Sequence, residues 1–205
     1  MTNGGVLGAS NEPTGGAGGV ASGLWNVEDV FTAVSTDNWP LNIIARGIFG
    51  GGYSTGTNSN VIDYITIATT GNATDFGNLT QARSGLAGCS SLTRGLFGGG
   101  MIGAAFPGGQ YNIIDYVTMA TTGNAIDFGN LTVSRGEGLD GCSSQTRGLF
   151  GGGWTGAFSN VIDYVAIATT GNATDFGDLT QARQSTSSCS STTRGLWAGG
   201  WLNSQ

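Results

Sequence analysis

The sequence repeats itself with a period of about 50 residues, and this feature most limits what the chain can fold into. Three complete units begin with Arg-Gly-(Ile/Leu)-Phe-Gly-Gly-Gly and cover residues 46–93, 94–146 and 147–193, and a partial fourth unit covers 194–205. Each complete unit also contains Ile-Asp-Tyr, Thr-Thr-Gly-Asn-Ala and Asp-Phe-Gly in that order. Repeats of this kind bury their apolar faces against their neighbours. The sequence therefore predicts one repeat domain over residues 46–205.

Each unit contains short strand-like runs separated by turns. The Arg-Gly run ends in glycines, which suits a strand that meets another backbone closely. The run at 61–68 is rich in β-branched and aromatic residues and largely apolar on both faces, which favours a strand covered on both sides. Asp-Phe-Gly and the small-residue run through Cys89 add two more strands. Four short strands per unit, packed between two other sheets, are typical of a β-propeller blade, so the sequence predicts an all-β fold.

The order and spacing of these elements resemble a kelch repeat. The resemblance covers roughly residues 40–205: a Gly-Gly element, an aromatic strand about a dozen residues later, and Leu-Thr-x-x-Arg before a small-residue strand. Phenylalanine stands where a kelch repeat usually carries tryptophan, at Phe76, Phe128 and Phe176. The insert TTGNAxDFG and the stretch GLWNVEDVFTAVSTDNWP resemble virion structural and fibre-like proteins of tailed phages, notably marine and cyanobacterial ones. The resemblance implies a kelch-like β-propeller on the surface of an extracellular virus particle.

The number of units is too small for a ring closed by the complete repeats alone, because propellers need at least about four blades. Either the segment 23–45 supplies the missing strands or another chain does, and association with copies of itself is the favoured expectation. Residues 1–22 are predicted to be a flexible Gly-rich arm. The segment 23–45 is predicted to anchor or cap the repeats through Leu24, Trp25, Val27, Phe31, Trp39 and Pro40.

Composition removes several functions. The chain has 13 acidic residues, 7 arginines, no lysine and no histidine, which gives a net charge of −6. Nucleic-acid binding needs a basic patch and is not expected. Ser-His and Cys-His catalysis and histidine metal sites are excluded. No run of about 20 apolar residues is present, so no membrane insertion is expected. We expect no catalytic residue, no metal site and no cofactor.

Every arginine and six aspartates recur at fixed repeat positions. Identical copies favour a structural role, in which guanidinium groups bond carboxylates and carbonyls between strands or blades. The alternative is a ring of carboxylates that binds cations or sugar hydroxyls. Glycoside hydrolysis by paired carboxylates is less favoured, because nothing distinguishes one acid pair from its copies. The residues are Arg46, Arg83, Arg94, Arg135, Arg147, Arg183, Arg194, Asp63, Asp75, Asp115, Asp127, Asp163 and Asp175.

The units differ most between Gly-Gly-Gly and Ile-Asp-Tyr, at residues 53–60, 101–112 and 154–160. Insertions in repeats map to loops on one face, often the binding face. Aromatic side chains there can stack on sugar rings or contact a protein partner, or they can pack against the next loop or subunit. These candidates are Tyr53, Phe106, Tyr111, Trp154 and Phe158.

Three functions follow from the sequence. The first is a non-enzymatic phage virion structural protein, a tail fibre, appendage or surface-decoration component. Its partners would be other virion proteins, copies of itself, and a host surface glycan or protein reached by the variable loops. The second is a stand-alone propeller-type carbohydrate-binding lectin. The third, an enzyme, is disfavoured by the missing histidine and lysine.

Overall fold

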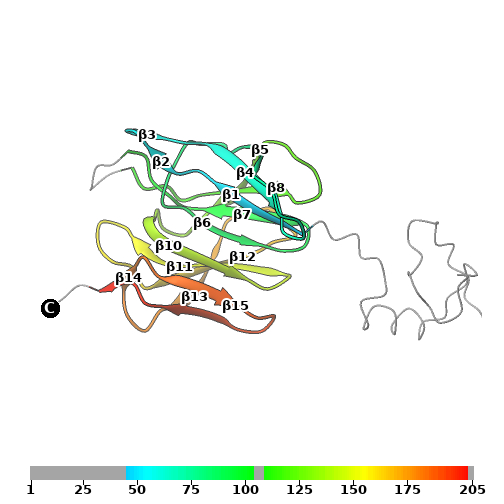
Figure 1. The fold of residues 1–205 in the computed structure, drawn as a ribbon. Coiled ribbons are helices and arrows are strands. Elements are labelled where there is room, and N and C mark those ends of the chain that lie inside the picture. Colours follow the sequence, from blue (N-terminus) through cyan, green and yellow to red (C-terminus); the bar gives the residue numbers. More distant parts are fainter. Residues whose placement is uncertain (1–44, 104–108, 203–205) are drawn as a thin grey trace, which may run out of the picture. The chain divides into compact units, whose positions relative to one another are not determined.

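The computed structural model describes residues 45–103 and 109–202, and the regular elements of this part of the chain are all β-strands (Figure 1). The predicted all-β class is confirmed. All the described strand pairs are antiparallel and belong to several small sheets, and the described strands do not close into a propeller. No helix in this part of the chain could cross a membrane. The predicted arm at 1–22, the anchor residues Leu24, Trp25, Val27, Phe31, Trp39 and Pro40, and Phe106 lie outside the described residues.

Three larger sheets carry the fold, and smaller pairs complete it. The first sheet has the order β1-β4-β5, the second β6-β7-β8-β9, and the third β10-β11-β12-β13. Their strands are β1 (Arg46–Gly50), β4 (Val61–Thr66), β5 (Thr74–Asn78), β6 (Ala87–Ser90), β7 (Arg94–Gly98), β8 (Ile113–Thr118), β9 (Ile126–Asn130), β10 (Gly136–Ser143), β11 (Arg147–Trp154), β12 (Val161–Ala166) and β13 (Thr174–Asp178). The two-stranded pairs are β2 (Tyr53–Ser54) with β3 (Thr57–Asn58), β14 (Arg183–Gln184) with β17 (Trp201–Leu202), and β15 (Ser187–Ser190) with β16 (Gly195–Ala198).

The sheets are offset from the sequence repeat by one strand. Strand β6 ends the first sequence unit, yet it pairs with β7 of the second unit. In the same way, β10 at the end of the second unit pairs with β11, and β15 at the end of the third unit pairs with β16. Among the described strands, the first sheet therefore has three strands, and β15 and β16 begin a fourth sheet.

The close approach of neighbouring sheets explains two glycine positions in each unit. The phenyl ring of Phe150 packs on Gly98, where an added Cβ would lie 2.7 Å from the ring. Gly99 has a φ of +67°, and its Cβ would lie 2.6 Å from the carbonyl oxygen of Arg135. The sequence predicts close backbone contact for this glycine run. The contact is to backbone at the second glycine, but it is to an aromatic ring at the first.

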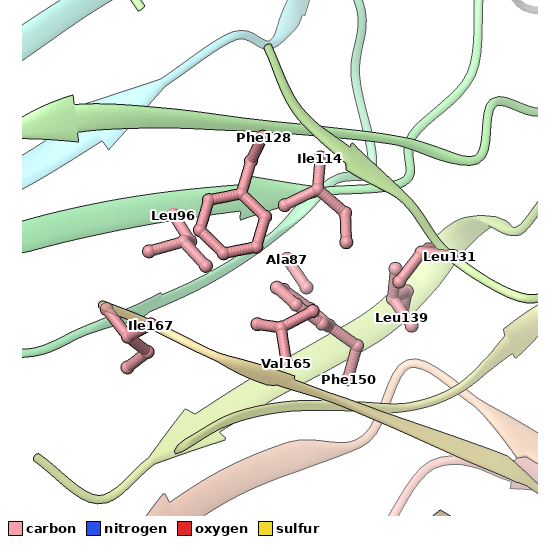
Figure 2. Close-up of a cluster of buried hydrophobic side chains, with 9 residues drawn as sticks. All are labelled: Ala87, Leu96, Ile114, Phe128, Leu131, Leu139, Phe150, Val165 and Ile167. Carbon is pink, nitrogen blue, oxygen red and sulfur yellow. The ribbon is translucent and has the colours of Figure 1, made fainter. Parts of the chain in front are cut away.

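Apolar side chains fill the space between successive sheets (Figure 2). Successive side chains of a strand point to opposite faces of its sheet. Each sheet therefore directs branched aliphatic and aromatic residues toward the sheets on both sides. The cluster between the second and third sheets consists of Ala87, Leu96, Ile114, Phe128, Leu131, Leu139, Phe150, Val165 and Ile167. A matching cluster between the first and second sheets consists of Ile62, Phe76, Leu79, Phe97, Val117 and Ala125.

The edges of neighbouring sheets are also joined by backbone hydrogen bonds. Gly123 N donates to the carbonyl oxygen of Phe76, and Ala125 N donates to that of Asn78, both at 2.8 Å. Gly171 and Ala173 make the same two bonds to the next strand edge, at 2.8 Å each. The Thr-Thr-Gly-Asn-Ala turn of each of these units therefore covers the free edge of the preceding sheet.

Candidate interaction site between the third and fourth sheets

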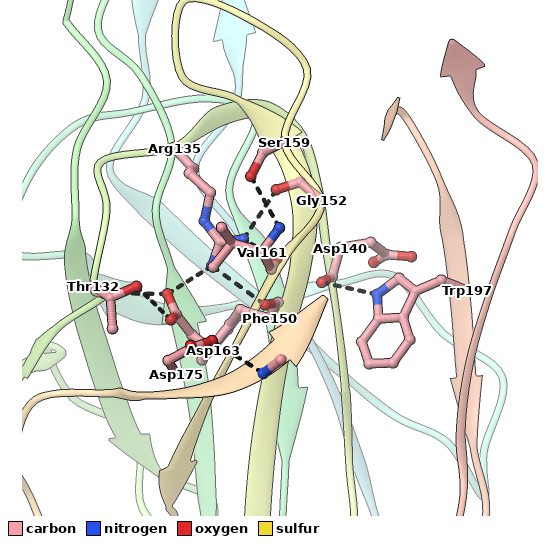
Figure 3. Close-up of polar contacts among 11 residues, drawn as sticks. Thr132, Arg135, Asp140, Phe150, Gly152, Ser159, Val161, Asp163, Asp175 and Trp197 are labelled. Carbon is pink, nitrogen blue, oxygen red and sulfur yellow. Dashed lines mark hydrogen bonds and ion pairs between the residues drawn. The ribbon is translucent and has the colours of Figure 1, made fainter. Parts of the chain in front are cut away.

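A buried polar contact joins the first sheet to the second and the second to the third. The carboxylate of Asp115 on β8 accepts hydrogen bonds from Thr80 N at 3.1 Å, Thr80 Oγ1 at 2.6 Å and Arg83 Nη1 at 2.8 Å. Asp163 on β12 accepts the same three bonds one unit later, from Thr132 N at 3.2 Å, Thr132 Oγ1 at 2.6 Å and Arg135 Nη2 at 2.7 Å (Figure 3). The motif Leu-Thr-x-x-Arg of one unit thus binds the Ile-Asp-Tyr aspartate of the next.

The arginine of this contact also donates hydrogen bonds to backbone carbonyl oxygens of the next sheet. Arg83 Nε donates to the carbonyl oxygen of Gly99 at 2.8 Å, and its Nη2 donates to that of Phe97 at 3.2 Å. Burial lowers the pKa of the Arg135 guanidinium, and the charge of Asp163 opposes this change. Both ion pairs are fully buried. A carboxylate in this position binds neighbouring sheets together and cannot reach a substrate in solvent.

A second arginine contact links neighbouring sheets at the start of each unit. Arg46 Nη1 donates to the carbonyl oxygen of Met119 at 2.7 Å, and its guanidinium lies 4.7 Å from the ring centre of Tyr64. Arg94 repeats the arrangement with the carbonyl oxygen of Ile167, at 2.9 Å. Arg147 retains the ring contact, with Tyr164 at 5.1 Å, but makes no side-chain hydrogen bond to the described residues.

Serine hydroxyls form a third link, along the strands that begin each sheet. Ser143 Oγ donates to the carbonyl oxygen of Ser90 at 2.6 Å and accepts from Ser90 N at 3.2 Å. Ser190 Oγ makes the same pair of bonds to Ser143, at 2.7 and 3.3 Å. The same serine hydrogen bonds therefore join the fourth sheet to the third and the third sheet to the second.

The third of these sheet junctions contains a pocket of about 400 Å³. It lies between the third sheet and strands β15 and β16, and its lining includes Arg147, Phe176 and Arg194. Cys142 also lines it, and burial, with smaller effects of Asp140 and Cys189, raises the pKa of the Cys142 thiol to about 11. This cysteine is a neutral thiol at pH 7 and a poor nucleophile. Two arginines and one aromatic residue therefore line this pocket.

The variable-loop aromatic residues occupy different environments. Tyr53 on β2 is exposed. Tyr111 is half-buried, and its hydroxyl accepts a hydrogen bond from Gln81 Nε2 at 3.1 Å. Trp154 packs edge-to-face on Phe158, with ring centres 5.3 Å apart. The structure thus brings Trp154 and Phe158 together as a packed pair and leaves the Tyr53 ring open to solvent.

The remaining repeat residues are more exposed. Asp75, Asp127 and Asp175 are exposed on β5, β9 and β13, and Asp175 Oδ1 accepts a bond from Gly177 N at 3.0 Å. Within residues 45–103 and 109–202, no group of three or more cysteine and acidic side chains is placed to hold a metal ion.

Sequence reasoning did not single out the threonine of Leu-Thr-x-x-Arg or the pocket. The threonine could have been found, because it recurs three residues before the arginine in every complete unit. The pocket's signal was the partial fourth unit at 194–205, which supplies strand β16 to pair with β15 of the third unit but has no Ile-Asp-Tyr run.

Comparison with known proteins gives no assignment. No protein-family model matches the chain, and no curated protein matches its sequence. The kelch-like and phage-like resemblances therefore enter below as proposals.

Proposed function

We propose that this chain is a non-enzymatic structural protein of a tailed-phage virion, built from kelch-like β-repeats. It serves as a fibre, appendage or surface-decoration component at the particle surface. One observation supports this most: the repeat-specific carboxylates Asp115 and Asp163 are fully buried in contacts between sheets. The arginines and aspartates that recur in the repeats thus hold neighbouring sheets together.

The propeller part of the proposal is supported by the form of the complete sheets. Each has four antiparallel strands, and each packs face to face with its neighbours through a core of its own. This is how a propeller blade is packed between two others. A small-angle scattering profile of the protein would separate a ring from an extended stack through the pair-distance distribution.

Host contact is assigned to the variable loops, because they differ between units while the sheets do not. Among the described aromatic residues of these loops, Tyr53 has an exposed ring. A loop residue that is free of internal packing can change without destabilising the sheets.

The proposal is tested by mass spectrometry of virus particles purified from a culture that carries the gene. Peptides of the chain are expected at many copies per particle, alongside those of the capsid protein. The phage polymerase, which is not expected in particles, serves as the control for contamination from the lysate. Particles free of the chain would overturn the proposal.

A stand-alone lectin is the second candidate, and the exposed Tyr53 ring favours it. Aromatic rings that stack on sugars must be open to solvent before the ligand arrives. A glycan array probed with the protein and with Tyr53→Ala would detect it. Binding that is lost in Tyr53→Ala and kept in Trp154→Phe would favour the lectin, and a blank array would exclude it.

A further inference from the structure

The two ends of the stack hold the unpaired halves of the buried Thr-Arg-Asp contact. Beside the third sheet, the Arg183 side chain donates to the carbonyl oxygen of Gly199 at 3.0 Å and to Gln181 Oε1 at 3.1 Å, and to no carboxylate of the described residues. Thr180 is exposed, and its side chain makes no hydrogen bond to the described residues. On the first sheet, Asp63 is the counterpart of Asp115 and Asp163, and no described residue bonds its carboxylate.

The apolar side chains at these two ends are complementary in the same way. Ile67 is 64% exposed, whereas its counterparts Met119 and Ile167 are 7% and 1% exposed. At the other end Phe176 is 52% exposed, whereas Phe76 and Phe128 are each 2% exposed. Inside the stack, Ile167 packs in the cluster that buries Phe128. Each exposed residue therefore lacks the partner that the other end could supply.

The backbone at the fourth sheet is open at the corresponding place. Strands β7 and β11 each have a neighbour on both edges, whereas β15 is the single partner of β16 among the described strands. The pocket with Arg147 and Phe176 lies beside this free edge. In the second and third sheets, the strand at this position is the Ile-Asp-Tyr strand, followed by the Asp-Phe-Gly strand.

We propose that the hairpin β4–β5 of a second copy completes the fourth sheet by pairing with β16. The shared sheet then has the order β15-β16-β4-β5, which matches β6-β7-β8-β9 of the second sheet. Arg183 and Thr180 of one copy bind Asp63 of the other, and Ile67 covers Phe176. Arg147 gains the carbonyl oxygen of Ile67, as Arg94 gains that of Ile167 within the chain. This proposal rests on the proposed structural function and names the surface through which copies associate.

The hairpin can exchange partners because β1 and β16 carry the same motif. The sequences are Arg-Gly-Ile-Phe and Arg-Gly-Leu-Trp, so either presents the same register to β4. Strand β1 is less covered than its counterparts β7 and β11: Phe49 is exposed, and among the described strands β1 pairs on one edge only. Exchange of an identical element between protomers is a low-cost route to dimers. In a dimer each copy would give its hairpin β4–β5 to the other. Each copy then contributes its two four-stranded sheets, and the two copies share two more. The number of sheets in such a dimer is within the range of blades in known propellers.

A charge-reversal pair tests the exchange. Asp63→Arg alone places a second guanidinium group against Arg183, and Arg183→Asp alone places two carboxylates together; each variant therefore repels itself. A mixture of the two variants restores an oppositely charged pair at both shared sheets. Light scattering on a sizing column would be read across a dilution series, with far-UV circular dichroism as the check that each variant folds.

We expect the wild-type protein to elute at twice the 20.7 kDa of one chain. Each variant alone should dissociate at a concentration at least tenfold higher than the wild type, and the mixture should recover the wild-type mass. A single-chain mass for the wild type at every concentration would overturn the proposal, and so would a dimer that both variants leave intact. The result is independent of the particle analysis: particles can contain a chain that is monomeric in solution, and a dimer can be absent from particles.

Discussion

Replacing Gly98 with alanine is expected to destabilise the protein, although alanine suits the backbone there. The φ of Gly98 lies outside the left-handed region, so an L-residue can adopt the conformation. The obstacle is steric. The new Cβ would lie 2.7 Å from Cε1 and 2.9 Å from Cδ1 of Phe150, and both distances are well below van der Waals contact.

The size of the effect follows from two opposing contributions. Restricting the unfolded chain by Gly→Ala stabilises a protein by about 0.4–1 kcal/mol where the site has room. Inserting a methyl group into a packed core costs about 1–3 kcal/mol. Phe150 is fully buried, so its ring cannot move aside freely. We therefore expect a net loss of about 1 kcal/mol in the free energy of unfolding.

Gly88→Ala is the matched control, because Gly88 lies on the neighbouring strand β6 and an added Cβ there meets only the carbonyl oxygen of Leu96 at 3.9 Å. This variant should be more stable than the wild type by a few tenths of a kcal/mol to about 1 kcal/mol. Urea unfolding followed by tryptophan fluorescence measures both variants. In a Phe150→Leu background the cost of Gly98→Ala should shrink.

The sign of the change decides the matter. If Gly98→Ala stabilises the protein as Gly88→Ala does, then the ring of Phe150 does not pack on Gly98 and the stacking of the sheets is wrong. A cost in both variants would point instead to a general intolerance of alanine in these strands.

Two further outcomes are expected. Cys142 should react slowly with iodoacetamide at pH 8 and faster as the pH rises toward 11, because its raised pKa keeps the thiol protonated; this is measured as adduct mass on the peptide that contains it. Ser143→Ala should cost about 0.5–1.5 kcal/mol in urea unfolding, because the hydroxyl bonds both backbone groups of Ser90. Ser90→Ala should be near neutral, since no described residue bonds the Ser90 hydroxyl, and equal costs for the two variants would refute this account of the serine link.

The local pattern of the sequence predicts the strands well. The run of β-branched and aromatic residues predicts a strand at 61–68, which the structure has at Val61–Thr66, and Asp-Phe-Gly marks the strand at Thr74–Asn78. Both signals are local, because they depend on side-chain shape and on the turn between them. The periodicity also predicts that the units pack on one another.

The pairing of the strands needs long-range information. Small residues at 87–90 are compatible with a strand, but nothing local tells whether that strand joins the preceding or the following sheet. The structure places it on β7, since Cys89 and Leu96 lie opposite each other in register. The offset between repeat and sheet follows from this pairing, and so does the half-completed fourth sheet.

The candidate site illustrates the same division. The sequence predicts that the arginines and aspartates act between strands, but it does not show which aspartate each arginine binds. The partner of Arg83 is 32 residues away, in the next unit. Only the stacking of the sheets reveals that Arg183 and Asp63 are the remaining halves of that contact.

A double-mutant cycle between Arg135 and Asp163 tests the central claim most directly. The cycle compares Arg135→Met, Asp163→Leu and the double variant in urea unfolding. Removing one partner leaves a buried charge and should cost about 3–5 kcal/mol, and removing both should cost much less than the sum. The structure predicts a coupling energy of at least about 1 kcal/mol across the two sheets. Costs that simply add would contradict the contact that holds one repeat to the next.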